Sequence, residues 1–143
     1  DLHEMPNEKY KVSRDRLFNL LDMNEFSSRR IGKLSTGMVQ KVNIARTMIH
    51  DPQVVVFDEP TSGLDVMASR SIISLIKSCK KDGKTIIFSS HRLAEIESLC
   101  DDLAIIHKGN LYFNGTYNEF ETQKKEKTLE DEFIRLVGSS NNV

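Results

Sequence analysis

The sequence contains no tryptophan, only two cysteines and three prolines, and few aromatic residues, which make up 7% of the chain. The cysteines, Cys79 and Cys100, are too few for a disulfide scaffold and lack the spacing of a metal-binding motif, so we predict two buried free thiols. No apolar run approaches the roughly 20 residues that a membrane-spanning helix needs. These absences argue against a small disulfide-stapled domain and against a membrane-spanning segment.

The charges nearly cancel, with 20 Lys and Arg against 21 Asp and Glu in 143 residues. A balanced charge removes the global electrostatic argument for nucleic acid or an anionic membrane as the main partner, and we expect no nucleic-acid partner. Hydrophobic residues make up 38% and charged residues 29%, which are ordinary proportions for a folded protein. The sequence therefore predicts a globular chain with a core of its own.

The spacing of apolar residues divides the chain into a helical part and an α/β part. Residues 1–12 are predicted to be irregular, and two stretches with helical spacing follow, from Ser13 to Leu21 and from Met38 to Ile49. The second stretch ends before Pro52, because proline disfavours the helical conformation of the residue that precedes it. We therefore predict a helical subdomain over residues 1–50 and the α/β remainder over 51–143.

The remainder alternates continuous apolar runs with helical patterns. The run at 54–57 is predicted to be a strand buried on both faces, and the run at 85–88 a second buried strand. The run at 103–106 is predicted to be another strand, and helices join all three in a parallel arrangement. Asp65 is a predicted N-cap of the first of these helices. Residues 108–110 predict a hairpin turn, and two helical patterns follow Gly115, the last with Thr128 as its cap. The fold class is therefore α/β, with a small, mostly parallel sheet flanked by helices.

Polar residues follow two of the predicted strands at the point where each strand ends. Asp58 and Glu59 follow the first strand, and Ser89, Ser90 and His91 follow the second. Ligands of parallel sheets bind beyond the carboxyl ends of the strands, and hard oxygen ligands there suit Mg²⁺. The alternative from these residues alone is that Asp58 caps a turn and that Glu59 is merely solvated.

The wider sequence context resembles one family. Residues 58–65 read Asp-Glu-Pro-Thr-Ser-Gly-Leu-Asp, which looks like the Walker B motif and D-loop of ATP-binding cassette (ABC) ATPases. Residues 34–38, Leu-Ser-Thr-Gly-Met, resemble the signature Leu-Ser-Gly-Gly-Gln of the same family. His91 follows the next strand, where that family has its switch histidine. The resemblance covers essentially the whole chain and implies a P-loop NTPase fold, of which this chain holds a part.

The resemblance implies ATP and Mg²⁺ as cofactors and assigns roles around the Walker B motif. Asp58 would hold Mg²⁺, and Glu59 would orient and deprotonate the attacking water as a general base. His91 would hydrogen-bond the γ-phosphate, although a lone histidine after a strand is more often a helix cap. Asp65 would contact the opposing subunit in addition to capping its helix.

The signature residues are implied to form an anion site at a helix N-terminus. Ser35 and Gly37 would bind the γ-phosphate through a hydroxyl and a backbone N–H, supported by the dipole of the helix that follows. Two positions depart from the family pattern, since Thr36 replaces the usual small residue and Met38 the usual Gln. Without the family context, residues 35–37 would be an ordinary helix cap.

The glycine-rich phosphate-binding loop of the family does not occur in this sequence. The nearest candidate, Gly83-Lys84-Thr85, has Ser78 where the first glycine is needed, and it precedes a strand instead of following one, so we predict a turn. The chain is therefore predicted to be the C-terminal half of an ABC ATPase domain, carrying the signature half of a composite site. By itself it is predicted to bind ATP poorly and to be inactive as an ATPase.

The resemblance implies the ATP-binding subunit of an ABC transporter, peripheral on the cytoplasmic face of a membrane. Its implied partners are a second nucleotide-binding domain and a membrane-spanning permease. Residues 128–136 are similar to the closing helix of exporter subunits, which favours the exporter type.

Two alternatives stay open from the sequence. One is an ABC-type ATPase of translation or DNA repair. The other is a phosphoacceptor receiver domain, in which Asp58, Ser89 or Ser90, and Lys108 would be the acceptor, hydroxyl and lysine.

Overall fold

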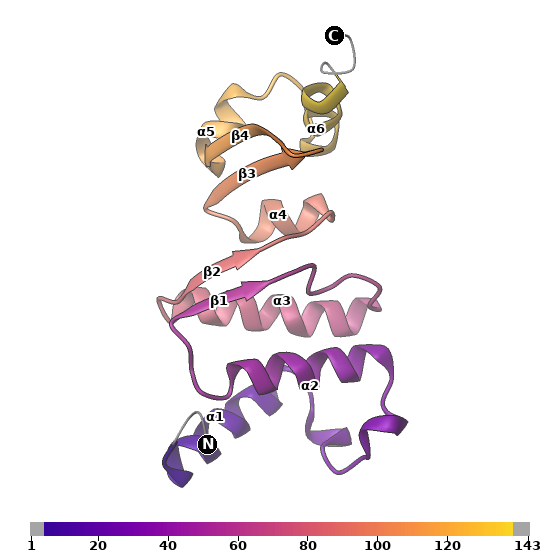
Figure 1. Ribbon diagram of the computed structural model, residues 1–143, viewed down its shortest axis with the longest axis vertical. Coiled ribbons are helices and arrows are strands. Elements are labelled where there is room, and N and C mark those ends of the chain that lie inside the picture. Colours follow the sequence, from indigo (N-terminus) through magenta and orange to yellow (C-terminus); the bar gives the residue numbers. More distant parts are fainter. Residues whose placement is uncertain (1–4, 139–143) are drawn as a thin grey trace. The chain divides into compact units, whose positions relative to one another are not determined.

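The computed structural model describes residues 5–138 of the chain (Figure 1). These residues form two compact units, which divide between Ser90 and His91. Both units combine helices with two-stranded sheets, so the predicted α/β class is confirmed. The predicted subdomain over residues 1–50 packs with later residues in the first unit, and a subdomain boundary after residue 50 stays a prediction.

The first unit begins with helices. Its elements are α1 (Asn7–Leu20), two 3-10 turns (Asn24–Phe26 and Ile31–Lys33), α2 (Thr36–Met48), β1 (Val54–Phe57), α3 (Val66–Lys81) and β2 (Thr85–Phe88). The expectation of an irregular segment over residues 1–12 is wrong from Asn7 onward. Pro6 stands at the N-cap of α1 and accepts a hydrogen bond from the Tyr10 N–H, a position that proline tolerates because it needs no N–H there.

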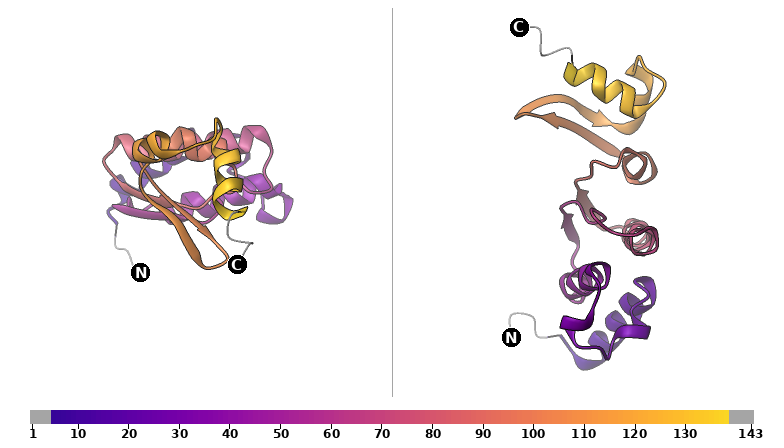
Figure 2. Two further views of the ribbon diagram at one scale, coloured as in Figure 1. Left: turned by 90° about the horizontal axis from the view of Figure 1, so that it is seen from above. Right: turned by 90° about the vertical axis from the view of Figure 1, so that its right-hand side faces the viewer.

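The core of the first unit lies around α3, which packs against α1, α2 and β2. Figure 2 shows α3 on one side of the two strands. Ile72 and Leu75 of α3 are almost fully buried. Cys79 is also buried, and burial raises the pKa of its thiol. Cys100 is half-buried in the second unit, and neither cysteine forms a disulfide.

Strands β1 and β2 are parallel, with Val54 opposite Thr85 and Phe57 opposite Phe88. The prediction that they are buried on both faces is wrong. Successive side chains of a strand point to opposite faces, and only the face of Val55 and Phe57 is buried. Val56, on the other face, is 67% exposed. An apolar run therefore identified the strands but not the number of covered faces.

The second unit contains α4 (Leu93–Leu99), β3 (Asp102–His107), β4 (Asn110–Thr116), α5 (Tyr117–Gln123) and α6 (Leu129–Gly138). The prediction of a third parallel strand is wrong, because β3 pairs antiparallel with β4 in a sheet of its own. Lys108 and Gly109 have φ values of 48° and 78°, which turn β4 back onto β3 as predicted for a hairpin. The local hairpin thus supplies the backbone partners of β3.

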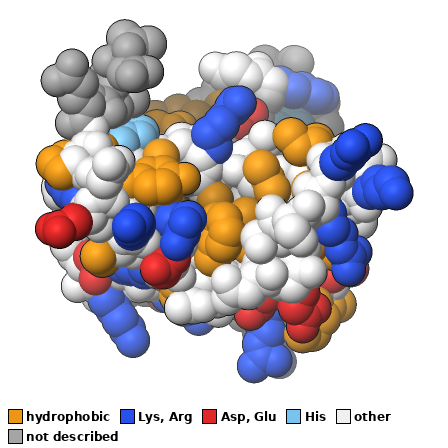
Figure 3. All heavy atoms as spheres, turned by 90° about the horizontal axis from the view of Figure 1, so that it is seen from below, with side chains coloured by type: hydrophobic (Ala, Val, Ile, Leu, Met, Phe, Trp, Pro, Cys, Tyr) orange, Lys and Arg blue, Asp and Glu red, His pale blue; other side chains and the backbone are white. Residues whose placement is uncertain are grey.

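Exposed apolar side chains are also present in the helical part of the first unit. Tyr10, Val12 and Ile31 are large apolar residues with exposed side chains. Figure 3 views the end of this unit that lies at the foot of Figure 1, and it shows apolar side chains near the middle with Lys and Arg side chains around them. Within residues 5–138, no helix has the length and apolar character required to cross a bilayer.

Candidate active site

The predicted polar edge of the sheet forms at the ends of β1 and β2. The hydroxyl of Ser89 donates to Oδ1 of Asp58 at 2.6 Å and accepts from the backbone N–H of Glu59 at 2.9 Å. The Ser89 N–H donates to the carbonyl of Phe57 at 2.9 Å. One serine therefore connects both carboxylate-bearing residues to the neighbouring strand. Its polar position after a strand was visible in the sequence, but its two contacts required the structure.

The backbone bends sharply at Glu59. Its φ is 44°, a left-handed conformation that non-glycine residues adopt at a cost of about 1–2 kcal/mol. The hydrogen bond from its N–H to Ser89 holds this conformation on one side. On the other side, the carbonyl of Glu59 accepts from the Ser62 N–H at 3.1 Å. Hydrogen bonds on both sides thus hold the backbone of the half-buried Glu59, which follows the exposed Asp58.

The chemistry of these donors fits Mg²⁺. This ion prefers oxygen ligands, keeps several waters, and uses one or two protein carboxylates together with substrate phosphates. Asp58 supplies an exposed carboxylate with one oxygen anchored by Ser89, and Glu59 is its neighbour. Among the described residues there is no group of three or more acidic, histidine or cysteine side chains able to hold a metal. Asp58 and Glu59 could thus supply the one or two carboxylates that Mg²⁺ takes from a protein.

The predicted signature residues lie at the N-terminus of α2. Ser35 is the N-cap, and its hydroxyl accepts from the Met38 N–H at 3.3 Å. Ser35 and Thr36 are exposed, whereas Met38 is half-buried. These residues stand at the start of a 13-residue helix, where the positive end of the helix dipole favours an anion.

Gly37 is buried where α2 meets α3. A Cβ atom added at Gly37 would lie 3.0 Å from Cβ of Ala68 and 3.8 Å from Oδ2 of Asp65. The close approach explains why glycine fits here, since any larger residue would press α2 away from α3. Asp65 caps α3 as predicted, because its Oδ1 accepts from the Ala68 N–H at 2.8 Å. The structure therefore brings the signature segment and Asp65 together.

His91 is the first residue of the second unit, and its side chain is exposed. Its phosphate-sensing role stays a prediction.

The turn at Gly83-Lys84-Thr85 is confirmed. Gly83 has a φ of 75°, and Lys84 Nζ lies 2.7 Å from both Oδ1 of Asp51 and the carbonyl of Pro52. Lys84 is thus committed to the start of β1, and hydrogen bonding by its ammonium lowers the pKa of Asp51. Its position excludes this lysine as a phosphate ligand.

The chain matches known proteins along most of its length. The family model for ABC transporters matches residues 2–62. The ABC transporter ATP-binding protein NatA of Bacillus subtilis is 38% identical over 126 residues, which are 87% of this chain and 51% of NatA. The chain belongs to the ABC transporter family of ATP-binding proteins. The bacitracin transport ATP-binding protein BcrA of Bacillus licheniformis is 40% identical over 126 residues, covering 80% of this chain and 41% of BcrA.

Solved structures agree with this family. An ATP-binding subunit of an ABC transporter superposes with a TM-score of 0.81 at 26% identity, covering 94% of this chain and 57% of that subunit. The cbiO1 protein of Clostridium perfringens, part of an ABC transporter complex, gives a TM-score of 0.68 at 26% identity. The P-loop NTPase fold class is therefore confirmed. The chain spans about half the length of these relatives.

Proposed function

We propose that this chain is part of the ATP-binding subunit of an ABC transporter, in which ATP binding and hydrolysis drive transport across a membrane. The contact that supports this best is Ser89, which holds Asp58 and Glu59 at one edge of the sheet. The relatives with transport in their names favour this function over translation or repair ATPases and over a receiver domain.

In this proposal, Asp58 binds Mg²⁺, which neutralises charge on the phosphates of ATP when it is bound. Glu59 orients the attacking water and accepts its proton. His91 hydrogen-bonds the γ-phosphate. The remaining site residues act on the ATP held by a second nucleotide-binding domain, and they are Ser35, Thr36, Gly37, Met38 and Asp65.

We also propose the partners and place of the complete protein. A membrane-spanning permease and a second ATP-binding domain are its partners, and it is peripheral on the cytoplasmic face of a membrane. BcrA is by name a bacitracin transport protein, which supports transport, and the exporter-like pattern of residues 128–136 supports the exporter type. The 143 residues include no glycine-rich phosphate loop, so this chain by itself is inactive in the proposal.

The decisive experiment replaces Glu59 by glutamine in the complete protein that carries this chain. We expect the rate of ATP hydrolysis to fall by about 10²–10⁴-fold, because the amide cannot accept the proton, while ATP binding is retained. Glu130→Gln, at an exposed acid of α6, is the control and leaves the rate unchanged. Wild-type hydrolysis by Glu59→Gln would contradict the assigned role.

The isolated chain provides a second test. Titration of the 143 residues with a fluorescent ATP analogue and Mg²⁺ is expected to show weak binding. Tight binding would contradict the prediction that the chain by itself binds ATP poorly.

A further inference from the structure

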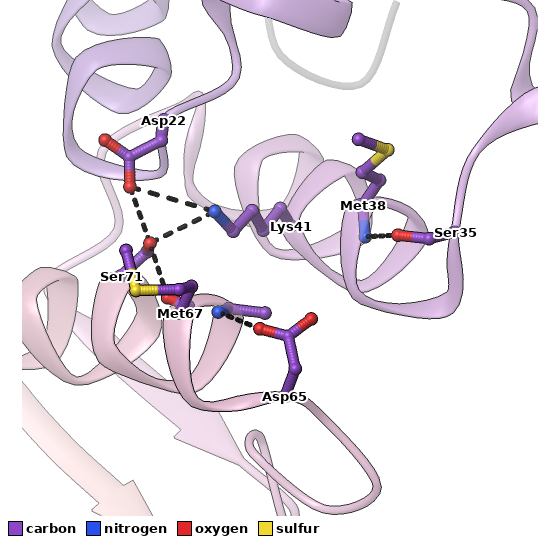
Figure 4. A network of polar contacts seen from close by, with 8 residues as sticks. Asp22, Ser35, Met38, Lys41, Asp65, Met67 and Ser71 are labelled. Carbon is purple, nitrogen blue, oxygen red and sulfur yellow. Dashed lines mark hydrogen bonds and ion pairs between the residues drawn. The ribbon is translucent and has the colours of Figure 1, made fainter.

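A lysine is buried between three segments of the first unit. Lys41, in α2, is 7% exposed, and its Nζ donates to the hydroxyl of Ser71 in α3 at 3.0 Å. The same Nζ lies 3.8 Å from Oδ2 of Asp22, which follows α1. The Ser71 hydroxyl lies 2.6 Å from that Asp22 oxygen, so the three side chains form a closed triangle (Figure 4). We call them the Lys41 triad.

A buried ammonium is costly to desolvate, by several kcal/mol, unless partners of good geometry surround it. In the Lys41 triad, the partners come from residues that are far from Lys41 in the sequence. A shift of α2 along α3 would separate Lys41 from Ser71 and leave the ammonium buried without a hydroxyl acceptor. The triad therefore favours one register between the two helices.

The two helices that the triad connects are those that begin at the candidate site. Lys41 lies six residues after Ser35, the N-cap of α2, and Ser71 lies six residues after Asp65, the N-cap of α3. At a rise of 1.5 Å per residue, the triad is about 9 Å along each helix from its cap. The two helices run in the same direction, since Gly37 near the start of α2 approaches Ala68 near the start of α3. The equal offsets therefore keep the two helix starts near one another when Lys41 and Ser71 are paired.

The helix starts also touch directly, through the packing of Gly37 on Ala68. This contact involves no directional hydrogen bond. By itself it sets the distance between α2 and α3 but does not prevent one helix from sliding along the other. The Lys41 triad adds a second, directional contact one to two turns away. Two contacts at different heights fix both the spacing and the register of α2 and α3.

We propose that Lys41 is a positioning residue, which acts with Ser71 and Asp22 to hold the Ser35–Gly37 segment in register with Asp65. The inference rests on the proposed function, in which both segments face the same nucleotide of a second subunit. Lys41 itself is buried and reaches the nucleotide only through the helix that it holds. Its loss changes the closed, hydrolysing dimer more than the binding of ATP to a single subunit.

The test is Lys41→Met in the complete protein, which keeps the length of the side chain and removes the charge. We expect kcat for ATP hydrolysis to fall about tenfold, since small misplacements of catalytic segments have effects of this order or larger. The affinity of the monomer for ATP is expected to change less than about twofold. Lys41→Arg keeps a cation with hydrogen-bond donors and is expected to retain at least half of the wild-type kcat. Lys77→Met, at an exposed lysine of α3, is the control.

Hydrogen exchange measured on the same proteins tests the register of α2 against α3 without ATP. We expect peptides that contain the Met38 and Ala68 amides, which donate to the two caps, to exchange about tenfold faster in Lys41→Met and faster in Ser71→Ala. Peptides from α5 and α6 keep their rates. If Lys41→Met does not fold, Ser71→Ala and Lys41→Arg test the inference in its place. Ser71→Ala is expected to lose kcat two- to threefold.

The outcomes separate this inference from the proposed function. A wild-type protein without ATPase activity contradicts the proposed function. The exchange rates at the starts of α2 and α3 then test by themselves whether Lys41 holds the register of the two helices. Unchanged exchange and unchanged kcat in Lys41→Met overturn the inference. Faster exchange with an unchanged kcat also overturns it, because the triad would then stabilise the helices without positioning the site.

Discussion

The first unit adds side-chain contacts between distant residues to its local helix caps at Ser35 and Asp65. In the first unit, side-chain contacts join residues that are 30 or more positions apart, as in Ser89 with Asp58 and Ser71 with Asp22. The second unit provides contacts between near neighbours, as in the capping box of Thr116 and Glu119. The long-range contacts position segments against one another, whereas the local contacts stabilise individual helices. The residues of the sheet edge and of the signature segment belong to the unit with long-range contacts.

The difference has a thermodynamic consequence. A local contact forms with little loss of chain entropy, since its residues are already close in a helix or turn. A contact between distant residues forms only when the tertiary fold has brought them together. Removing a long-range contact is therefore expected to weaken the whole unit, and removing a local contact is expected to weaken mainly one helix.

The largest effect is expected at Lys84, whose side chain is 5% exposed and connects β2 to the residues before β1. Lys84→Met is expected to lower the free energy of unfolding by about 2–3 kcal/mol, because the Pro52 carbonyl and Asp51 lose a charged donor. Denaturant unfolding followed by circular dichroism measures the change. Lys77→Met, at an exposed lysine, should change stability by less than about 0.5 kcal/mol. Equal effects of the two variants would contradict the conclusion that the long-range contact of Lys84 stabilises the whole first unit.

A smaller, pH-dependent effect is expected at Glu132, whose side chain is 3% exposed. Hydrogen bonds from Arg135, and then from the backbone N–H groups of Lys125 and Glu126, lower the pKa of Glu132 to about 2. Because the folded-state pKa is below the ordinary 4.5, the stabilisation is complete above about pH 4.5 and is lost as the pH falls towards 2.

Glu132→Gln is therefore expected to lower the free energy of unfolding by about 1–2 kcal/mol at pH 7, with the difference from wild type shrinking between pH 4.5 and 2. Unfolding curves measured at several pH values give this difference. Glu130→Gln, at an exposed acid in the same turn, is the control. A difference that stays constant down to pH 2 would show that the hydrogen bonds do not depend on the charge of Glu132.

The smallest effect is expected at the capping box of α5. The Thr116 hydroxyl accepts from the Glu119 N–H at 3.1 Å, and Oε2 of Glu119 accepts from the Thr116 N–H at 2.8 Å. Thr116→Ala is expected to cost about 1 kcal/mol, whereas Thr116→Ser keeps the hydroxyl and most of the stability. Faster hydrogen exchange in Thr116→Ala that is confined to α5 would support the conclusion that a local contact stabilises mainly its own helix. Faster exchange throughout the second unit would show that this local contact stabilises more than its own helix.

Much of the second unit and of the helix caps followed from local sequence patterns. The hairpin at Lys108–Asn110 and the caps at Asp65 and Thr128 depend on neighbouring residues, and the structure confirms them. Strand partners did not follow from the sequence. The run at 103–106 looked like a third parallel strand, because an apolar run does not specify which strand it will pair with.

The candidate site divides in the same way. The motif residues were visible in the sequence, and the structure confirms that the ends of β1 and β2 share an edge. The two contacts of Ser89 and the burial of Lys41 were not predicted, because a serine after a strand and a lysine in a helix are ordinary surface residues by local pattern. Their roles arise only from partners that are distant in the chain.

The order of residues alone determined the family of this protein, most of its helices and turns, and the chemical groups at its candidate site, since each depends on residues that are close together in the sequence. Only the folded structure decided which strands pair, which face of the sheet is covered, and which polar groups are buried together. The physical reason is that pairing and burial are set by contacts between segments far apart in the chain.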